Sequence, residues 1–304
     1  MQPNPKFQNK PKEFWANVRT ISQEAGYTIR GEGQVKVPSI AEIKNAYSFL
    51  KLDVGKIIDQ KNGLTEFGKS LLEYFRYRAK ILNDFVRPHL MNTEKAKSLF
   101  TQLYRQLSPK CPIPKNKQKG DKRAEAYFTG IINMLIEAHS DGFPCDYDPR
   151  TLTTVTKGRF PLRTLSRRID GAFPSSVNPI AVWEIKEYYY TTTFGSRVAD
   201  GVYETLVDGM ELEELHEHEN IEVFHYLMVD AYYTWWDCGR SYLCRIIDML
   251  HMGYVDEVLF GSEVKKRLPI LVKKWVSLAK KKKRSALCDY SPVSKRLNRN
   301  ISSR

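Results

Sequence analysis

The sequence lacks the features that mark membrane-bound, secreted and disulfide-linked proteins. No stretch of its 304 residues approaches the roughly 20 apolar residues of a membrane span, and the first residues, MQPNPKFQNKPKEFW, contain no apolar segment of the signal-peptide kind. The five cysteines form no Cys-X-X-Cys pair. Such an odd, scattered set predicts reduced thiols, with neither a disulfide framework nor a zinc site. We therefore expect a cytoplasmic protein that has no membrane partner.

Acidic residues are scarce in the last part of the chain. From Lys265 to Arg304 there are fourteen Lys and Arg residues and one acid, Asp289, so this region alone carries the net charge of +13 of the whole protein. Residues 1–264 are therefore neutral overall. Such a region attracts phosphate backbones through counterion release, without sequence preference. The alternative is a solvated, partly disordered tail.

The length and the distribution of turn-forming residues predict two folded domains before this basic region. Residues 108–123, SPKCPIPKNKQKGDKR, are rich in proline and lysine and mark a boundary. This segment is either a linker or a loop that grips a nucleic-acid backbone. We expect a mainly helical N-terminal domain over residues 1–115, an α/β core over residues 116–264 and the basic C-terminal region over residues 265–304.

Two carboxylates and a lysine are expected to meet at one end of a hairpin in the core. Residues 180–190 are rich in β-branched and aromatic side chains, which favours a strand. Glu184 and Lys186 share one face of that strand, because they are two residues apart. Asp170 ends a short strand predicted over Arg167–Ile169, and the polar turn that follows lets the chain reverse and set Asp170 beside Glu184.

This group of side chains suits metal-assisted hydrolysis of a phosphodiester. Two carboxylates hold a hard divalent cation such as Mg²⁺, which polarises a phosphoryl oxygen and lowers the pKa of a bound water. A lysine then orients that water or stabilises charge on the phosphate. The alternative is a structural ion pair on a strand, since acid-X-Lys triplets recur by chance at Glu42-Ile43-Lys44 and Glu263-Val264-Lys265. Neither of these two follows an aspartate that ends a strand.

Asp170, thirteen residues and then Glu184-Ile185-Lys186 resemble the PD-(D/E)XK nuclease superfamily, and most of all its type II restriction endonucleases. The resemblance covers roughly Glu125 to Phe260, and Ile169 stands where the family has its name-giving proline. It implies an α/β fold, with a restriction-endonuclease-like mixed sheet flanked by helices. It also implies a hydrolase: a Mg²⁺-dependent, metal-binding and DNA-binding endonuclease that cuts double-stranded DNA at a specific sequence.

The resemblance also implies roles for individual residues. Asp170 and Glu184 would be metal ligands, with the carbonyl of Ile185 as a further oxygen, and Lys186 would orient the attacking water. In the family a helix precedes the first catalytic strand and often carries a glutamate that faces the metal. The helix predicted over residues 124–139 offers Glu125 for that role.

The partners implied by the resemblance are those of a restriction-modification system. They are double-stranded DNA, a DNA methyltransferase that protects the host, and a second nuclease subunit, because each strand needs its own active site. That subunit is either a second copy of this chain or a related chain.

Four residues after the catalytic strand suit contacts to the phosphates of the scissile DNA strand. They are Thr192, Thr193, Ser196 and Arg197. Ser196 is also predicted to be the N-cap of the next helix. The alternative is a capped helix start with one surface arginine.

The N-terminal domain offers a second group of candidate DNA contacts. A helix that opens with the capping box Ser39–Glu42, a short apolar element, an Asn-Gly turn and a helix capped by Thr65 are together similar to winged-helix modules. In such a module Lys44 and Lys61 would contact DNA. The alternative is a helical subdomain that only packs against the core. Two other functions stay open for the whole chain: a non-catalytic DNA-binding protein, or a nuclease of repair or junction resolution.

Overall fold

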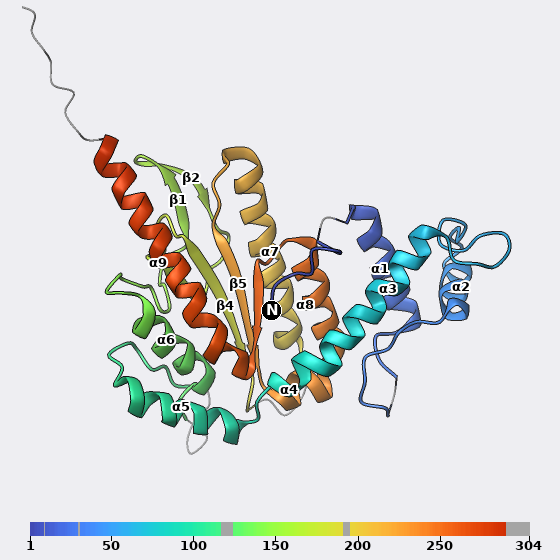
Figure 1. Cartoon of the computed structure of the whole chain (residues 1–304), viewed down its shortest axis with the longest axis horizontal. Coiled ribbons are helices and arrows are strands. Elements are labelled where there is room, and N and C mark those ends of the chain that lie inside the picture. Colours follow the sequence, from blue (N-terminus) through green and yellow to red (C-terminus); the bar gives the residue numbers. More distant parts are fainter. Residues whose placement is uncertain (9, 30, 117–123, 191–194, 290–304) are drawn as a thin grey trace, which may run out of the picture.

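The computed structural model describes residues 1–8, 10–29, 31–116, 124–190 and 195–289. It is a mixed α/β structure, in which a helical part lies at one end and a sheet flanked by helices lies at the other (Figure 1). Within the described ranges, no helix combines the length and the apolar character needed to cross a membrane. The four cysteines whose side chains are described are free thiols, as predicted: Cys111, Cys145, Cys238 and Cys244.

Helices build the N-terminal part. They are α1 (Lys12–Ala25), α2 (Ile40–Phe49), α3 (Glu66–Ile81), the π-helical turn η1 (Leu82–Val86) and α4 (Arg87–His89). Helix α2 begins at the predicted capping box, in which Glu42 N donates to Ser39 Oγ at 3.2 Å and Ser39 N donates to Glu42 at 2.9 Å. The described residues of this part form two isolated β-bridges, Thr28–Val35 and Ile58–Leu64, but no strand of a wing-like hairpin.

A four-stranded mixed sheet is the centre of the second part. In spatial order its strands are β3 (Gly171–Phe173), β4 (Ala181–Glu187), β5 (Phe224–Asp230) and β6 (Glu257–Phe260). Strand β3 pairs antiparallel with β4, whereas β4, β5 and β6 are parallel. The carboxyl ends of these three strands therefore share one edge, where Glu187 pairs with Asp230. A separate ribbon consists of β1 (Thr154–Lys157) and β2 (Phe160–Thr164).

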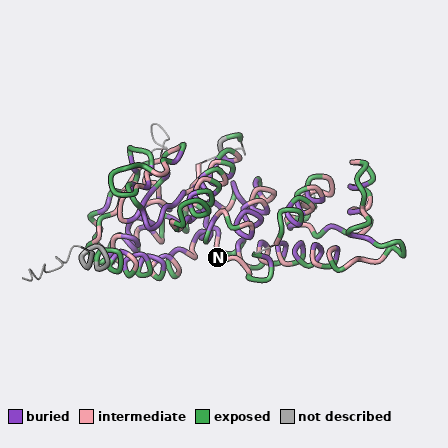
Figure 2. Tube along the Cα trace, turned by 90° about the horizontal axis from the view of Figure 1, so that it is seen from above, coloured by how far each residue is buried: buried purple, intermediate pink, exposed green. Residues whose placement is uncertain are grey.

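Helices cover both faces of the sheet, as predicted. One face carries α5 (Thr93–Leu107), α6 (Tyr127–His139) and α9 (Val264–Asp289), and the other carries α7 (Ser196–Glu219) and α8 (Arg240–Met252) (Figure 1). Short helical turns precede α8 and α9, namely η3 (Tyr233–Cys238) and η4 (Gly261–Glu263). Successive strand residues alternate between the two faces, so Trp183 packs toward α6 and α9 whereas Val182 packs toward α7. Figure 2 shows buried segments between these layers and also among the helices of the N-terminal part.

Two helices pack on the sheet although the sequence had assigned them to other regions than the core. Helix α5, assigned to the domain over residues 1–115, packs on α6 with the rings of Phe100 and Tyr127 5.5 Å apart. Helix α9, assigned to the basic region from residue 265, buries one apolar side against the sheet: Leu268, Leu271, Val272, Trp275, Val276 and Ala279. The C-terminal region is therefore, in its described residues, a structural element of the core.

A buried ion pair joins the helical part to the sheet part. Arg78 of α3 donates to both oxygens of Asp248 of α8, at 3.0 and 2.9 Å, and also to Ser22 of α1 at 3.1 Å. The hydroxyl of Tyr74 donates to the same Asp248 at 2.5 Å. Arg78 and Asp248 are 1% and 4% exposed. Because removing either partner would leave a buried charge, this pair fixes α3 against α8.

Candidate active site

Asp170 was predicted to end a strand, but in the structure it lies directly before one. Residues 167–169 form no strand, and β3 begins one residue after Asp170, at Gly171. Gly171 pairs with Trp183, and a Cβ atom at residue 171 would lie 2.2 Å from the indole ring. The strands therefore approach closely here because Gly171 has no side chain. Arg167, three residues before Asp170, turns toward the acidic side chains of α7.

The predicted meeting of Asp170 with Glu184 is confirmed. Asp170 N donates to Glu184 Oε1 at 3.2 Å, and Ile185 N donates to Asp170 Oδ2 at 2.8 Å. The antiparallel register of β3 and β4 brings these residues together at the open end of the hairpin. Asp170 is solvent exposed, whereas Glu184 is fully buried.

Glu184 and Lys186 share one face of β4, as the two-residue spacing predicted. Lys186 Nζ lies 2.6 Å from Glu184 Oε2, and the lysine is 6% exposed. Their neighbour Val182 packs toward α7 on that face. Trp183, on the opposite face, stacks on Trp275 of α9.

Three residues that the sequence analysis did not select complete this ion cluster. Arg167 Nη1 lies 3.0 Å from Glu184 Oε1 and 2.6 Å from Asp208 Oδ2, while its Nη2 lies 3.2 Å from Glu204 Oε2. Glu204 also lies 3.5 Å from Lys186 Nζ. Glu204 and Asp208 are four residues apart on α7, so they share one face of that helix.

Crowding of charge shifts the ionisation of the cluster. Burial, followed by the charge of Glu184, raises the pKa of Asp208 to about 7. Burial, followed by the charge of Glu184, also raises the pKa of Asp170 to about 6. Because the residue is partly open to solvent, burial contributes less there than at a fully enclosed site. Burial works to raise the pKa of Glu184, but the charges of Lys186 and Arg167 outweigh it and lower that pKa. Burial likewise opposes the charge of Lys186, yet Glu184 and Asp170 raise its pKa, so it remains an ammonium at neutral pH.

A recess of about 920 Å³ opens at this end of the hairpin. Asp170, Lys186 and Glu204 contribute to its lining. Three exposed cations stand along it as well: Lys115, Arg150 and Arg168. Tyrosines 188–190 and Tyr147 supply aromatic surface. The recess is therefore lined both by acidic side chains and by basic groups suited to phosphate.

The residues present fit a hard divalent cation in donor chemistry. Among the described residues, no group of three or more His, Cys, Asp or Glu side chains converges to hold a metal. The donor set would be Asp170, Glu184 and the Ile185 carbonyl, which are all oxygen ligands of the kind that Mg²⁺ prefers. Both oxygens of Glu184 are bonded to cations, at Arg167 and Lys186, so one of these contacts must lengthen when a metal binds.

The structure does not bring Glu125 into this group. Glu125 lies before α6, is half-buried, and is not among the residues that line the recess. Glu187 of β4 holds the start of α6 instead, because its carboxylate accepts from Thr129 N at 2.9 Å and from Thr129 Oγ1 at 3.0 Å. Burial raises the pKa of Glu187 to about 6. Its position next to the selected Lys186 was the only signal for it in the sequence.

The candidate phosphate contacts after β4 are described only in part. Thr192 and Thr193 lie outside the described residues, and so does the side chain of Arg197. The prediction of Ser196 as an N-cap is wrong, because α7 begins at Ser196 itself and Gly195 is the cap residue. Glycine satisfies that position through its extended backbone, and no side-chain cap forms.

Lys44 and Lys61 lie at the far end of the molecule from β4. Helix α2, which carries Lys44, is at the end opposite the sheet (Figure 1). Lys44 Nζ donates to Asn62 Oδ1 at 2.7 Å, in the turn that also contains Lys61. These lysines therefore do not reach the phosphates that lie at Asp170. A DNA duplex would contact both places only if it spanned both parts of the molecule.

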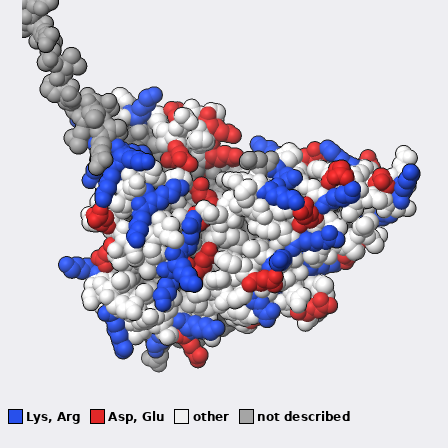
Figure 3. Space-filling view, viewed as in Figure 1, with Lys and Arg blue, Asp and Glu red and all other residues white. Residues whose placement is uncertain are grey.

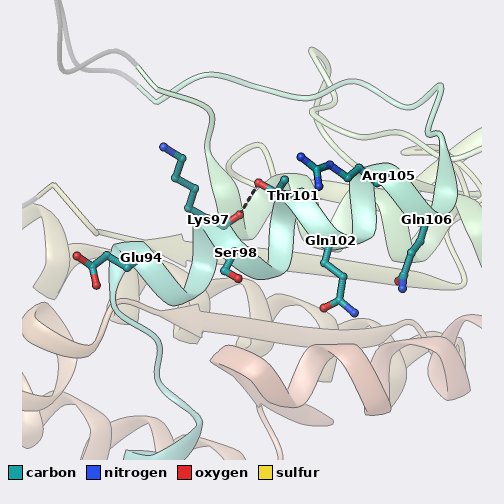
Figure 4. A pocket seen from close by; sticks show the side chains of 7 residues that line it. All are labelled: Glu94, Lys97, Ser98, Thr101, Gln102, Arg105 and Gln106. Atoms are coloured by element: carbon teal, nitrogen blue, oxygen red, sulfur yellow. Dashed lines mark hydrogen bonds between the residues drawn. The ribbon is translucent and has the colours of Figure 1, made fainter.

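A second hollow, of about 650 Å³, lies along α5. Figure 4 shows its seven residues on that helix, where the hydroxyl of Thr101 donates to the carbonyl of Lys97 at 2.8 Å. The seven are Glu94, Lys97, Ser98, Thr101, Gln102, Arg105 and Gln106. Because all of them come from one helix, they form a surface furrow without an opposing wall, and we assign no function to it.

Comparison with known proteins gives a family but no activity. No curated protein matches the chain. No solved structure matches it either. Residues 1–85 match a family model described as a domain of unknown function (DUF7690), and residues 91–275 match a second model, described as a domain of unknown function (DUF7687). The second match starts just before α5 and includes the sheet, the ion cluster and much of α9. Since it covers more than half of the sequence, the chain belongs to the DUF7687 family.

Proposed function

We propose that this protein is a Mg²⁺-dependent endonuclease that hydrolyses phosphodiester bonds of double-stranded DNA, and that it acts as a type II restriction enzyme. One observation carries the proposal. Asp170, Glu184 and Lys186 meet at the open end of the β3–β4 hairpin, beside a recess that is lined by basic residues. The mixed sheet flanked by helices supports a restriction-endonuclease-like fold, although it is also compatible with other α/β folds.

The residues of the cluster have distinct roles in this proposal. Asp170, Glu184 and the Ile185 carbonyl would hold Mg²⁺, which supplies charge neutralisation at the phosphate and a bound water of lowered pKa. Lys186 keeps its proton at neutral pH, so it acts by donating hydrogen bonds and by placing positive charge beside the scissile phosphate. Arg168 and Arg150 of the recess bind the neighbouring phosphates.

The biological setting follows from the chemistry of a double-strand cut. Each DNA strand needs its own active site, so the chain works with a second nuclease subunit, which is either identical or related. A DNA methyltransferase of the same restriction-modification system protects the host sequence, and the reaction takes place in the cytoplasm, where the host DNA lies.

A non-catalytic DNA-binding protein is the second candidate, and a specific observation favours it. Glu184 is fully buried and both its oxygens are bonded to cations, which is the arrangement of a structural ion pair. In that case DNA is bound elsewhere, for example by the surface of the helical N-terminal part that includes Lys44 and Lys61. A nuclease of repair or junction resolution keeps the same site but requires a different DNA structure.

Cleavage of mixed long DNA in the presence of Mg²⁺ tests these functions. The wild-type protein is compared with Glu184→Ala and Lys186→Ala, each assayed alone and with any co-encoded nuclease subunit. Lys265→Ala is the matched control, because Lys265 ends the acid-X-Lys triplet Glu263-Val264-Lys265, which lies outside the cluster. Discrete fragments from the wild type and Lys265→Ala, but not from the other two variants, are the expected result.

The other outcomes separate the alternatives. Smeared products, or cutting confined to branched or flapped DNA, would replace the restriction enzyme by a nuclease of repair. DNA binding that persists in EDTA, without cleavage by any variant or subunit combination, would establish the binding protein and refute the nuclease.

A further inference from the structure

Helix α9 presents a strongly basic surface to solvent. Between residues 265 and 283 it has nine Lys and Arg residues and no acid. Its apolar side is buried against the sheet, so the helix is fixed in place and its cations point outward. Figure 3 shows Lys and Arg gathered over this helix, on the face of the molecule that α9 covers in Figure 1.

Four lysines of α9 form a row along one side of the helix. Lys266, Lys273, Lys274 and Lys281 are all exposed, and their spacings of seven and eight residues bring them to the same side. At 1.5 Å per residue the row from Lys266 to Lys281 is about 22 Å long. Lys274 is steadied by the ring of Phe224, with its Nζ 3.9 Å from the ring centroid. A straight, rigid row of cations suits a straight, rigid polyanion.

This row lies on the opposite side of the sheet from the ion cluster. Trp275 of α9 stacks on Trp183 of β4 at a centroid distance of 5.6 Å. The next residue of β4, Glu184, points to the other face, where Arg167 and the acids of α7 surround it. A DNA segment on α9 is therefore distinct from a segment whose phosphate lies at Asp170.

We propose that the outer face of α9, defined by Lys266, Lys273, Lys274 and Lys281, binds duplex DNA as a second, sequence-independent contact surface. An anionic membrane is a poorer partner, since membrane-surface helices insert an apolar face and that face of α9 is buried in the core. Among the side chains of α9 that the structure describes, Ile270 is the one large apolar side chain exposed to solvent. The choice of DNA over RNA rests on the proposed nuclease function, whereas the binding itself requires neither metal nor cleavage.

Salt dependence of binding provides the test, measured in EDTA so that cleavage has no influence. The variant Lys266→Gln/Lys273→Gln/Lys281→Gln is compared with the wild type on a fluorescent duplex of about 30 base pairs between about 50 and 200 mM salt. Each lost phosphate contact decreases the magnitude of the negative slope of log K against log salt by about 0.9. We therefore expect the slope to become less steep, its magnitude decreasing by about two to three. The affinity at low salt should fall at least about tenfold.

The control has the same change in net charge at other surface lysines. Lys6→Gln/Lys56→Gln/Lys69→Gln removes three lysines of the N-terminal part whose side chains are 57%, 59% and 60% exposed. It should leave the slope nearly unchanged. Circular dichroism and thermal melting establish that both triple variants are folded.

Three results would overturn the proposal. The first is an unchanged slope in the α9 variant. The second is an equal loss in the control, which would mean that net charge alone matters. The third is a larger loss of binding to duplex RNA or to phosphatidylserine vesicles than to DNA, which would assign the surface to another partner. If the wild-type protein does not cleave DNA in the Mg²⁺ assay but the α9 variant has a less steep salt dependence, the nuclease function is refuted and the α9 binding surface is retained.

Discussion

The buried carboxyl of Asp208 gives a sharp test of the ion cluster. Asp208 is completely buried; one oxygen accepts from Arg167 at 2.6 Å, and the other has no hydrogen-bond partner among the described residues. Burial and then the charge of Glu184 raise its pKa from 3.8 to about 7. Because the pKa is higher in the folded state, the folded protein holds this proton more tightly than the unfolded chain does. The resulting stabilisation is complete below about pH 4 and is lost as the pH rises through about 7.

The size of the effect follows from the shift. At about 1.4 kcal/mol per pKa unit, the stabilisation lost between about pH 5 and pH 8 is about 2–3 kcal/mol. Asp208→Asn keeps an oxygen for Arg167 but cannot ionise. Its free energy of unfolding relative to the wild type should therefore rise by about 2–3 kcal/mol between these two pH values. Other carboxyl groups titrate in both proteins and cancel in this difference.

Urea denaturation at the two pH values measures this difference. Asp84→Asn, at an exposed position of η1, is the control and should differ from the wild type by the same amount at both pH values. A flat difference for Asp208→Asn as well would mean that Asp208 is ionised throughout. The account of three carboxylates crowded around Arg167 would then be wrong.

Two further predictions concern the packing that holds the site in place. Arg78→Met should lower the free energy of unfolding by about 3–5 kcal/mol, because it leaves Asp248 charged and buried; adding Asp248→Leu should recover part of that loss in a double-mutant cycle, and no recovery would contradict the pairing. Gly171→Ala should cost about 1–3 kcal/mol, because the new methyl group would overlap the ring of Trp183. Thermal melting measures the cost. A smaller cost of Gly171→Ala in a Trp183→Leu background than in the wild type supports the overlap, and an equal cost in both contradicts it.

The sequence predicted the hairpin end because short-range rules decide it. A two-residue repeat sets which side chains of β4 share a face, and this placed Lys186 beside Glu184 without knowledge of the rest of the fold. The sequences of β5, an apolar run buried on both faces, and of helix α8, with an apolar repeat, follow short-range patterns of the same kind. The start of β3 was misjudged, because the close approach at Gly171 depends on the shape of Trp183 across the sheet.

The sequence could not supply Arg167, Glu204 and Asp208. The two acids lie 17 and 21 residues after the end of β4, on α7. They enter the site only because α7 packs on the same sheet face as Lys186. A highly acidic helix gives the same sequence signal whether it faces water or a buried arginine. The apolar repeat of α9 was likewise present in the sequence, but its lysine content dominated the interpretation, so its role in the core was missed.

The charge balance of the cluster links its ionisation to the proposed chemistry. Asp170, Glu184, Glu204 and Asp208 share two cations, Arg167 and Lys186, so the fully ionised cluster has two negative charges in excess. Glu184 and Asp208 are buried, so the negative charge in excess is unfavourable where they carry it. Protons relieve it at Asp170 below about pH 6 and at Asp208 below about pH 7, as their raised pKa values indicate. A single divalent cation would relieve the whole excess and displace those protons. In the proposed nuclease the divalent cation would therefore take the place of these protons, whereas a purely structural set of ion pairs would need only two carboxylates for its two cations.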